Sequence, residues 1–262
     1  MATDRTILIT GSTDGLGKRV AEKLAAPGIH LLVHGRDTAR GQAVVDSIER
    51  AGGTAQFFAA DLASLAAVRR LAQAVQAEHA RLDVLINNAG IARIRSPRQL
   101  STDGFELHFA VNYLAPFLLT HLLSPQLAAT VVNVVSAGQS PIKFDDVMLE
   151  RGYNSIRAYG QSKLAQVMFT FDLAEELRGR NVSVNYLHPG TYIDTAMVRD
   201  AGIKPITSVD TAAEAVVALV NLSDTTGRYF DGTHEARANA QAYDPEARRR
   251  LRNISVERVS PI

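Results

Sequence analysis

Residues Thr10–Gly17 read TGSTDGLG, and this glycine-rich stretch lies between an apolar run and a helical pattern. The apolar run, Thr6–Thr10, has the composition of a buried strand, and Lys18–Ala26 has the spacing of a helix. A strand, a glycine-rich turn and a helix in this order form the first unit of an open α/β sheet. The stretch therefore predicts the fold class of the chain.

The glycines of this turn indicate a site for a dinucleotide, although their spacing alone also fits an ordinary turn. Gly11 permits a tight turn, Gly15 lets the backbone approach a pyrophosphate, and Gly17 lets the helix pack closely on the sheet. The helix N-terminus presents unpaired N–H groups to the phosphates. We therefore predict cofactor contacts along the whole turn, at Gly11, Ser12, Thr13, Asp14, Gly15, Leu16 and Gly17.

Apolar runs and helical patterns alternate along the rest of the chain. Strands are predicted at His30–His34, Ala55–Ala60, Val84–Asn87, Val131–Val135 and Val182–Leu187, with a weak one at Arg228–Phe230. Helices are predicted at Thr38–Arg50, Ser64–His79, Phe105–Leu123, Ser155–Arg178, Val209–Leu222 and Pro245–Asn253. This alternation predicts one α/β domain over residues 1–262, a doubly wound parallel sheet with helices on both faces.

The composition excludes several classes of function. With 46% hydrophobic residues the chain can form a sizeable core, and a net charge of +1 argues against nucleic-acid or membrane-surface partners. Without cysteine there is neither a disulfide nor a thiolate site, and the scattered histidines predict no metal site. Because no apolar run reaches membrane-spanning length and no signal pattern opens the chain, we expect a cytoplasmic protein with no membrane partner.

The end of the second predicted strand distinguishes between the two nicotinamide cofactors. An acid there would bind the adenosine ribose, whereas an arginine accommodates the 2′-phosphate of NADP. Arg36 ends the strand and Asp37 follows it as a helix cap, which favours NADP. Asp14 argues against this, because its carboxylate would repel the phosphate, and Arg36 is alternatively a plain surface charge. We predict NADP and leave NAD open.

Two further strand ends carry residues that suit a cofactor. After the third strand, Asp61 and Leu62 place a carboxylate where it would accept a hydrogen bond from adenine, or cap the next helix. After the fourth strand, the sequence Asn87–Gly90 combines two amides with two small residues. We expect one side chain to tie neighbouring strands together while the backbone passes close to the cofactor. The predicted contacts are Asp61, Leu62, Asn88, Ala89 and Gly90.

Tyr159 and Lys163 place a phenol and an ammonium four residues apart, on one face of the predicted helix Ser155–Arg178. The ordinary pKa of a phenol, about 10, is too high for proton transfer at neutral pH. We expect Lys163 to lower the pKa of Tyr159 and also to bind the ribose of the cofactor. A surface contact between the two side chains is the alternative.

Ser136 and Asn112 complete the candidate catalytic set. Ser136 ends the fifth strand, where its hydroxyl would hold the substrate oxygen beside Tyr159, or only close a turn. Asn112 lies inside an apolar helix, where a buried amide needs a partner. It would order a water that links Lys163 to solvent, or make a structural hydrogen bond.

In its ordered motifs the chain resembles the short-chain dehydrogenase/reductase family, from Thr10 through the turn Pro189–Thr191. The resemblance implies a Rossmann-like fold of about seven parallel strands and a catalytic tetrad. It also implies nicotinamide contacts from the turn after the sixth strand. The residues that carry these roles here are Asn112, Ser136, Tyr159 and Lys163 for the tetrad, and Pro189, Gly190 and Thr191 for the turn, besides the cofactor contacts of Tyr159 and Lys163.

Finer motifs resemble the retinol dehydrogenase and protochlorophyllide reductase-like branch. They are HGRD at His34–Asp37, VNYLAPFLLTHLL at Val111–Leu123, YGQSKLAQVMF at Tyr159–Phe169 and TGRYF at Thr226–Phe230. Unlike the membrane-bound retinoid enzymes, this sequence shows no N-terminal anchor, which puts a retinoid substrate in doubt. The family commonly pairs its two long helices between subunits, which implies a homo-oligomer, a dimer or a tetramer.

These observations predict an NADP-preferring oxidoreductase that interconverts a carbonyl and an alcohol, with Tyr159 as the general acid or base. The alternative is a catalytically silent NADP sensor or scaffold on the same fold. An epimerase or dehydratase fits less well, because it needs a further substrate domain. Residues Gly190–Thr207 mix chain breakers with apolar side chains, and we predict that they form a lid over a small, mainly apolar substrate.

Overall fold

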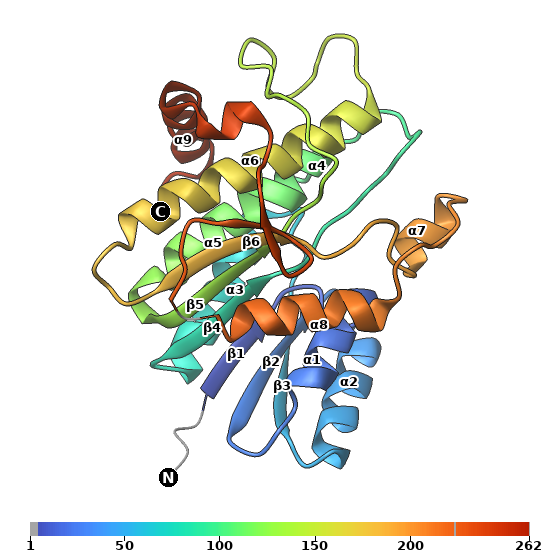
Figure 1. Ribbon diagram of the computed structural model, residues 1–262, viewed down its shortest axis with the longest axis vertical. Coiled ribbons are helices and arrows are strands. Elements are labelled where there is room, and N and C mark those ends of the chain that lie inside the picture. Colours follow the sequence, from blue (N-terminus) through green and yellow to red (C-terminus); the bar gives the residue numbers. More distant parts are fainter. Residues whose placement is uncertain (1–4, 223, 262) are drawn as a thin grey trace.

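A computed structural model describes residues 5–222 and 224–261 as one eight-stranded sheet with helices on both faces (Figure 1). The strand order is β3-β2-β1-β4-β5-β6-β7-β8, and β1 to β7 are parallel. The strands are β1 (Arg5–Ile9), β2 (Ile29–Gly35), β3 (Thr54–Ala59), β4 (Leu82–Asn87), β5 (Leu127–Val134), β6 (Ser183–His188), β7 (Tyr229–Asp231) and β8 (His234–Ala236). The Rossmann-like prediction is confirmed.

The eighth strand was not predicted. It pairs antiparallel with β7 at the edge of the sheet, and it is only three residues long. Because His234 and Glu235 are exposed and polar, the segment lacks the apolar run by which the other strands were found.

The helices divide between the two faces of the sheet (Figure 1). One face carries α1 (Gly15–Leu24), α2 (Thr38–Arg50) and α8 (Val209–Val220), and the other carries α3 (Leu65–Glu78), α5 (Ala115–Leu123) and α6 (Ser155–Glu176). In β1, Ile7 and Ile9 face the first group while Leu8 faces the second. Both faces are buried, which explains why most residues of the inner strands are apolar.

The predicted helix Phe105–Leu123 is in fact interrupted. It consists of α4 (Leu107–Phe109), the π-helical turn η1 (Ala110–Leu114) and α5, and a 3-10 turn η2 (Ser124–Gln126) follows. Pro116 accounts for the interruption, because it has no N–H to donate to the Asn112 carbonyl as a regular α-helix requires. The Ala115 N–H accordingly bonds to the Ala110 carbonyl.

Among the described residues, the stretch Leu107–Gln126 is long and apolar enough to cross a membrane. The expectation that no run reaches this length was therefore wrong. Its most apolar window is 83% buried inside the protein, as is typical of a core helix. By itself the stretch is weak evidence for a membrane span.

The C-terminal helix α9 (Pro245–Val259) extends past the predicted end and packs on the two long helices (Figure 1). The Tyr113 hydroxyl of η1 lies 2.6 Å from the Ser255 hydroxyl. Arg248 lies 3.5 Å and Arg252 3.8 Å from the carboxylate of Asp172 in α6. Helix α9 thus occupies part of the surface on which we expected subunits to pair. Homo-oligomerisation stays a prediction.

Candidate active site

Tyr159 and Ser136 meet at the carboxyl edge of the sheet. Asn154 caps α6 by accepting a hydrogen bond from the Arg157 N–H, and Tyr159 follows in the first turns of this helix. Burial raises the pKa of the Tyr159 phenol, and a hydrogen bond with the Ser136 hydroxyl partly opposes this rise. The Ser136 hydroxyl also accepts the Gly138 N–H at 3.0 Å. The serine thus closes a turn and contacts the tyrosine.

Lys163 lies in the same helix, one turn beyond Tyr159, and is 5% exposed. Its Nζ donates to the Val134 carbonyl at 3.2 Å and to Gln166 Oε1 at 3.3 Å. Burial without a carboxylate partner lowers the pKa of Lys163 to about 8. Nζ is 6.0 Å from the centre of the Tyr159 ring.

The expected lowering of the Tyr159 pKa by Lys163 is absent from this structure. Burial dominates the pKa of the phenol, and Ser136 is the group that lowers it. The physical reason is the direction of Nζ, which bonds to the end of β5 at Val134.

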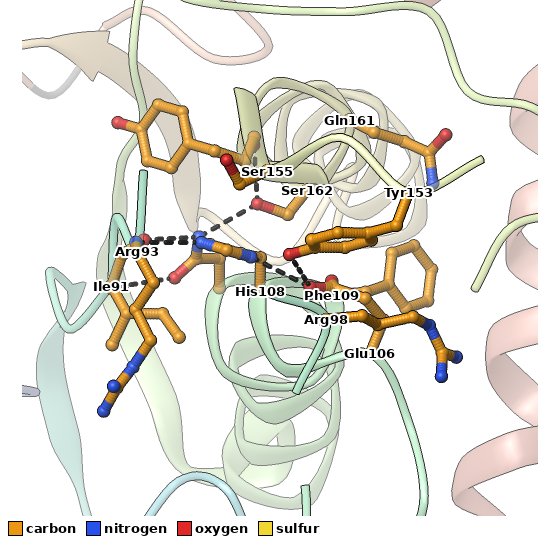
Figure 2. A network of polar contacts seen from close by, with 12 residues as sticks. Ile91, Arg93, Arg98, Glu106, His108, Phe109, Tyr153, Ser155, Gln161 and Ser162 are labelled. Carbon is orange, nitrogen blue, oxygen red and sulfur yellow. Dashed lines mark hydrogen bonds and ion pairs between the residues drawn. The ribbon is translucent and has the colours of Figure 1, made fainter. Parts of the chain in front are cut away.

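Both the oxygen and the nitrogen of the Asn112 side-chain amide make structural hydrogen bonds. Its Oδ1 accepts the Ile91 N–H at 2.8 Å, and its Nδ2 donates to the Ile91 carbonyl at 3.0 Å and to the Ser162 hydroxyl at 2.9 Å. Ile91 and Ser162 are labelled in Figure 2. The Ser162 hydroxyl in turn donates to the Tyr159 carbonyl at 2.7 Å. The side chain therefore fixes the helix of Tyr159 against the segment that follows β4.

The glycine-rich turn leaves no room for side chains. A Cβ atom at Gly11 would lie 2.9 Å from the Cα of Ala89, and one at Gly17 would collide with the Gly11 carbonyl and the Asn88 amide. Asn88 Nδ2 donates to the carbonyls of Thr10 and Gly11 at 2.9 and 3.1 Å. The prediction that an amide ties these strands together is confirmed.

Gly90 brings the segment after β4 close to two of the candidate catalytic residues. A Cβ atom at Gly90 would lie 3.3 Å from Asn112 Oδ1 and 3.4 Å from Lys163 Nζ. The motif after β4, the amide of Asn112 and the ammonium of Lys163 therefore share one place, as their order in the sequence predicted.

The segment that follows β6 reaches the glycine-rich turn through Thr195. Gly190 has a φ of +146°, which favours glycine, and its neighbours are the Thr207 side-chain atoms. The Thr191 hydroxyl is 3.2 Å from His188 Nε2. Farther along, the Thr195 methyl lies 3.2 Å from where a Cβ of Gly15 would be. The predicted lid segment therefore reaches the predicted phosphate site.

Comparison with known families gives one match over most of the chain: the short chain dehydrogenase model matches residues 5–205. The chain belongs to the short-chain dehydrogenase family. Human retinol dehydrogenase 13 is 37% identical, with 94% of this chain and 82% of that protein covered. Mouse polyprenol dehydrogenase is 38% identical, with 94% and 81% covered. The predicted resemblance to the retinol dehydrogenase branch is confirmed.

Solved structures agree with this assignment. A protein of unassigned function from Mycobacterium paratuberculosis has a TM-score of 0.84 at 30% identity, with 98% of this chain and 94% of that one covered. A short chain dehydrogenase from Burkholderia cenocepacia, solved in complex with NADP, has a TM-score of 0.71 at 30% identity, with 88% and 96% covered. Like its relatives, this short-chain dehydrogenase is an oxidoreductase of a family that binds NAD or NADP.

Two arginines lie at the edge of the predicted cofactor site, and only Arg36 was predicted there. In this short-chain dehydrogenase Arg36 lies 4.0 Å from Asp61, and Arg40 lies 3.3 Å from Asp14. Asp37 caps α2 as expected, accepting the Arg40 N–H at 3.0 Å. Arg40 was missed because its helical position gave no signal. It neutralises Asp14, the residue that argued against a phosphate.

Asp61 and Leu62 lie at the turn after β3, as predicted. Asp61 Oδ1 accepts the Ala63 N–H at 3.0 Å, so this carboxylate closes the turn. Leu62 is 6% exposed and packs in the core, so its side chain serves the fold.

Two side chains of the glycine-rich turn belong to the core as well. Ser12 is fully buried, and its hydroxyl donates to the Ile9 carbonyl and accepts the His34 N–H. Leu16, in the first turn of α1, packs in the core. A cofactor could therefore contact only the backbone of Ser12 and Leu16. The Thr13 side chain, which lies beside Gly35, is partly exposed.

His34 is a supporting residue that the sequence reasoning missed. Its Nδ1 accepts the Gly11 N–H at 3.1 Å, which holds the glycine-rich turn against the end of β2. Burial lowers the pKa of His34 to about 4, so the imidazole stays neutral and can accept this bond. The sequence did not reveal this contact, because His34 and Gly11 are 23 positions apart and meet only where β1 and β2 end side by side.

Among the described residues no group of three or more His, Asp or Glu could hold a metal ion. A cleft of about 310 Å³ opens beside the segment that follows Ser136. Ala137 and Gln139 line one side and residues of β7, β8 and the following loop line the other, with Asp231, Arg237 and Asn239 as polar members. Its size suits the part of a substrate beyond the reacting carbon.

Proposed function

We propose that this protein interconverts a carbonyl compound and an alcohol with a nicotinamide cofactor, and that Tyr159 moves the proton. The observation that carries the proposal is the meeting of Tyr159 and Ser136 at Gly138, where a Cβ atom would lie 3.4 Å from Ser136 Oγ and 3.8 Å from Tyr159 Cε1, with Lys163 close to the phenol ring. A silent sensor would need the glycine-rich turn but not a phenol placed beside a hydroxyl and an ammonium. The arrangement therefore favours the enzyme over the sensor or scaffold.

The residues present fit a nicotinamide dinucleotide. Gly11 and Gly17 let the turn pack tightly against Asn88 and Ala89, and the N-terminus of α1, which begins at Gly15, lies in the same turn. The turn Gly11–Gly17 would hold the pyrophosphate, Asp61 the adenine, Asn88–Gly90 and Lys163 the ribose, and Pro189–Thr191 the nicotinamide. When bound, the cofactor supplies or takes up the hydride.

In the reduction, Tyr159 donates its phenolic proton to the substrate oxygen, and in the oxidation it accepts the alcohol proton. The Ser136 hydroxyl, bonded to the same phenol, orients that oxygen. Because burial raises the pKa of Tyr159, the phenolate needs a cation close by. Lys163 Nζ is the nearest candidate and would turn from Val134 towards the phenol.

We infer that the substrate is a mainly apolar alcohol or the matching aldehyde or ketone. Two relatives are named for retinol and polyprenol, both long apolar alcohols. The lid segment exposes Tyr192, Met197 and Ile206, which would cover an apolar chain. Location in the cytoplasm, absence of a membrane partner and assembly into homo-oligomers stay predictions.

The experiment that tests this proposal is a panel of alcohols, aldehydes and ketones of increasing chain length. Each is incubated with NADP or NADPH, and the absorbance of the reduced cofactor is followed. Turnover that improves with apolar length supports the proposal. Cofactor binding without turnover of any compound would favour the sensor.

Arg36→Asp is expected to reverse the cofactor preference. It removes a charge-assisted contact to the 2′-phosphate and adds a repulsive carboxylate near Asp61. The loss of such a contact, about 1.5–3 kcal/mol, raises the Kd of NADP roughly 10- to 100-fold. Titration with both cofactors measures the ratio, and Arg70→Asp, on an exposed face of α3, is the control. An unaltered ratio would make Arg36 a plain surface charge.

The lid segment is expected to close when ligands bind. Two backbone hydrogen bonds join the two ends of the segment at its base. The Asp194 N–H donates to the Thr207 carbonyl, and the Ile206 N–H donates to the Tyr192 carbonyl. Its tip, α7 (Ala196–Asp200), buries no residue. Hydrogen exchange of residues 195–205 should slow markedly with cofactor plus a substrate analogue, while the amides of Asp194 and Ile206 in the base stay protected throughout. Equal exchange of the tip in both states would exclude closure.

A further inference from the structure

A buried carboxylate, Glu106, lies with its hydrogen-bond partners beside Tyr159 and has no role in the chemistry above. Glu106 is 2% and His108 1% exposed, and His108 Nδ1 lies 2.9 Å from Glu106 Oε1. Figure 2 shows Tyr153 above the same carboxylate, to which its hydroxyl donates at 3.2 Å. Ionic groups this far from solvent are costly unless every one of their bonds is satisfied.

The partners of Glu106 keep it ionised. Burial alone would raise its pKa, but hydrogen bonds from His108 and from the Phe109 backbone outweigh burial, and the pKa lies below its ordinary value. Glu106 Oε2 accepts the Phe109 N–H at 2.8 Å, so the carboxylate also caps α4.

The bonds of His108 fix its tautomer. Nε2 lies 3.0 Å from the backbone N of Arg93, and a backbone N–H can only donate, so Nε2 must be the bare nitrogen. The ring proton is therefore on Nδ1, directed at Glu106. A second proton on Nε2 would face the Arg93 N–H, donor against donor. The imidazole is thus held neutral and in one orientation.

His108 is the middle of three anchors on the segment Ile91–Arg95. Asn112 bonds both backbone groups of Ile91, His108 accepts the Arg93 N–H, and the Ser155 hydroxyl of α6 accepts the Arg95 N–H at 2.9 Å. The segment continues directly from Gly90, beside Lys163. It therefore links the predicted ribose site to the start of the helix that carries Tyr159 (Figure 2).

His108 also contacts the catalytic ring itself. The ring centres of His108 and Tyr159 are 6.4 Å apart with an angle of 83° between the planes, an edge-to-face contact. The imidazole therefore restricts how the phenol can tilt.

We propose that His108 is a positioning residue for Tyr159: oriented by Glu106, it clamps Arg93 and supports the tyrosine ring in the reacting position. The inference rests on the proposed function, since it concerns the same phenol. Displacement of a catalytic group by about 1 Å can lower turnover roughly 100-fold, so loss of the clamp lowers kcat without changing cofactor affinity.

Two substitutions separate the two bonds of the imidazole. His108→Gln places an amide oxygen near the position of Nε2 and keeps the Arg93 bond, whereas His108→Asn places an amide nitrogen near Nδ1 and keeps the Glu106 bond. His108→Asn is expected to lower kcat about 10-fold or more, with the Kd of NADP within about twofold of wild type. His108→Gln should restore kcat to within about threefold of wild type.

Tyr153→Phe is the matched control, because it removes a different hydrogen bond to Glu106 and leaves the Arg93 clamp intact. Its kcat should stay near the wild-type value even if the protein unfolds at a lower temperature. Equal losses of kcat in the Asn, Gln and Phe variants would overturn the proposal, as they would reveal a general effect of stability. Wild-type kcat in His108→Asn would overturn it as well.

Hydrogen exchange at the Arg93 amide tests the clamp without any activity assay. The amide should be protected in wild type and in His108→Gln, and exposed to exchange in His108→Asn. Protection retained in His108→Asn overturns the clamp. If the wild-type protein turns over no carbonyl compound, the proposed function fails while this readout still judges the clamp, so the two failures are distinguishable.

Discussion

Replacing Tyr159 with Phe is expected to abolish nearly all turnover while the fold and the cofactor affinity persist. The change removes one hydroxyl, which carries the proton in the proposed reaction and bonds to Ser136. General acid–base catalysis by such a group contributes about 10²- to 10⁴-fold, and kcat should fall by at least that factor. The ring remains, so its contact with His108 and the packing of α6 are preserved.

The measurement is a single-turnover rate of cofactor oxidation, together with the Kd of NADP and the midpoint of thermal unfolding. Tyr153→Phe again serves as the comparison, because it also removes one phenolic hydroxyl, bonded to a carboxylate rather than to Ser136. A Tyr159→Phe protein with near-native kcat would mean that another group moves the proton, and the assigned chemistry would be wrong.

Replacing Lys163 with Met is expected to produce two opposite effects, a loss of turnover and a gain in stability. The loss follows because Lys163 is the cation nearest to the phenol and to the predicted ribose site at Gly90. Both kcat and the affinity for NADP should fall, kcat by about 10²-fold or more. Methionine fills a similar volume without the charge, so the core stays packed.

The gain in stability follows from the pKa of the buried amino group. The pKa is about 8 in the folded protein and 10.5 as the ordinary value. Below pH 8 both states hold the proton, and the folded state bears the cost of a buried ammonium. Between pH 8 and 10.5 the unfolded state holds more protons, so wild-type stability rises with pH. At pH 7 the cost is up to about 3 kcal/mol, partly offset by the two hydrogen bonds of Nζ.

Urea unfolding at pH 7 and pH 10 measures this effect. The Lys163→Met protein should be more stable than wild type at pH 7 by about 1–3 kcal/mol, and the difference should shrink at pH 10. A variant that is less stable at both pH values would mean that the hydrogen bonds to Val134 and Gln166 outweigh burial. Unchanged NADP affinity would show that Lys163 does not hold the ribose.

The sequence by itself determined the sheet, the cofactor turn and the order of the catalytic residues. A run of apolar residues is the pattern of a strand that is buried on both faces. Glycines such as Gly11 and Gly17 mark places where the backbone packs closely against other parts of the chain. Tyr159 and Lys163 share a helical face, so their spacing alone placed them together. For this pair the decisive neighbour is close in sequence.

Only the tertiary structure decided which polar partners these residues have. Lys163 donates to the Val134 carbonyl and not to the phenol, Asn112 forms hydrogen bonds with the Ile91 backbone, and Arg40 forms an ion pair with Asp14. The physical reason is that a hydrogen bond or ion pair forms between whichever groups the folded backbone brings within about 3 Å, and these groups come from separate elements. His108 is the clearest case, since its three neighbours Glu106, Arg93 and Tyr159 meet only after the sheet and α6 are in place.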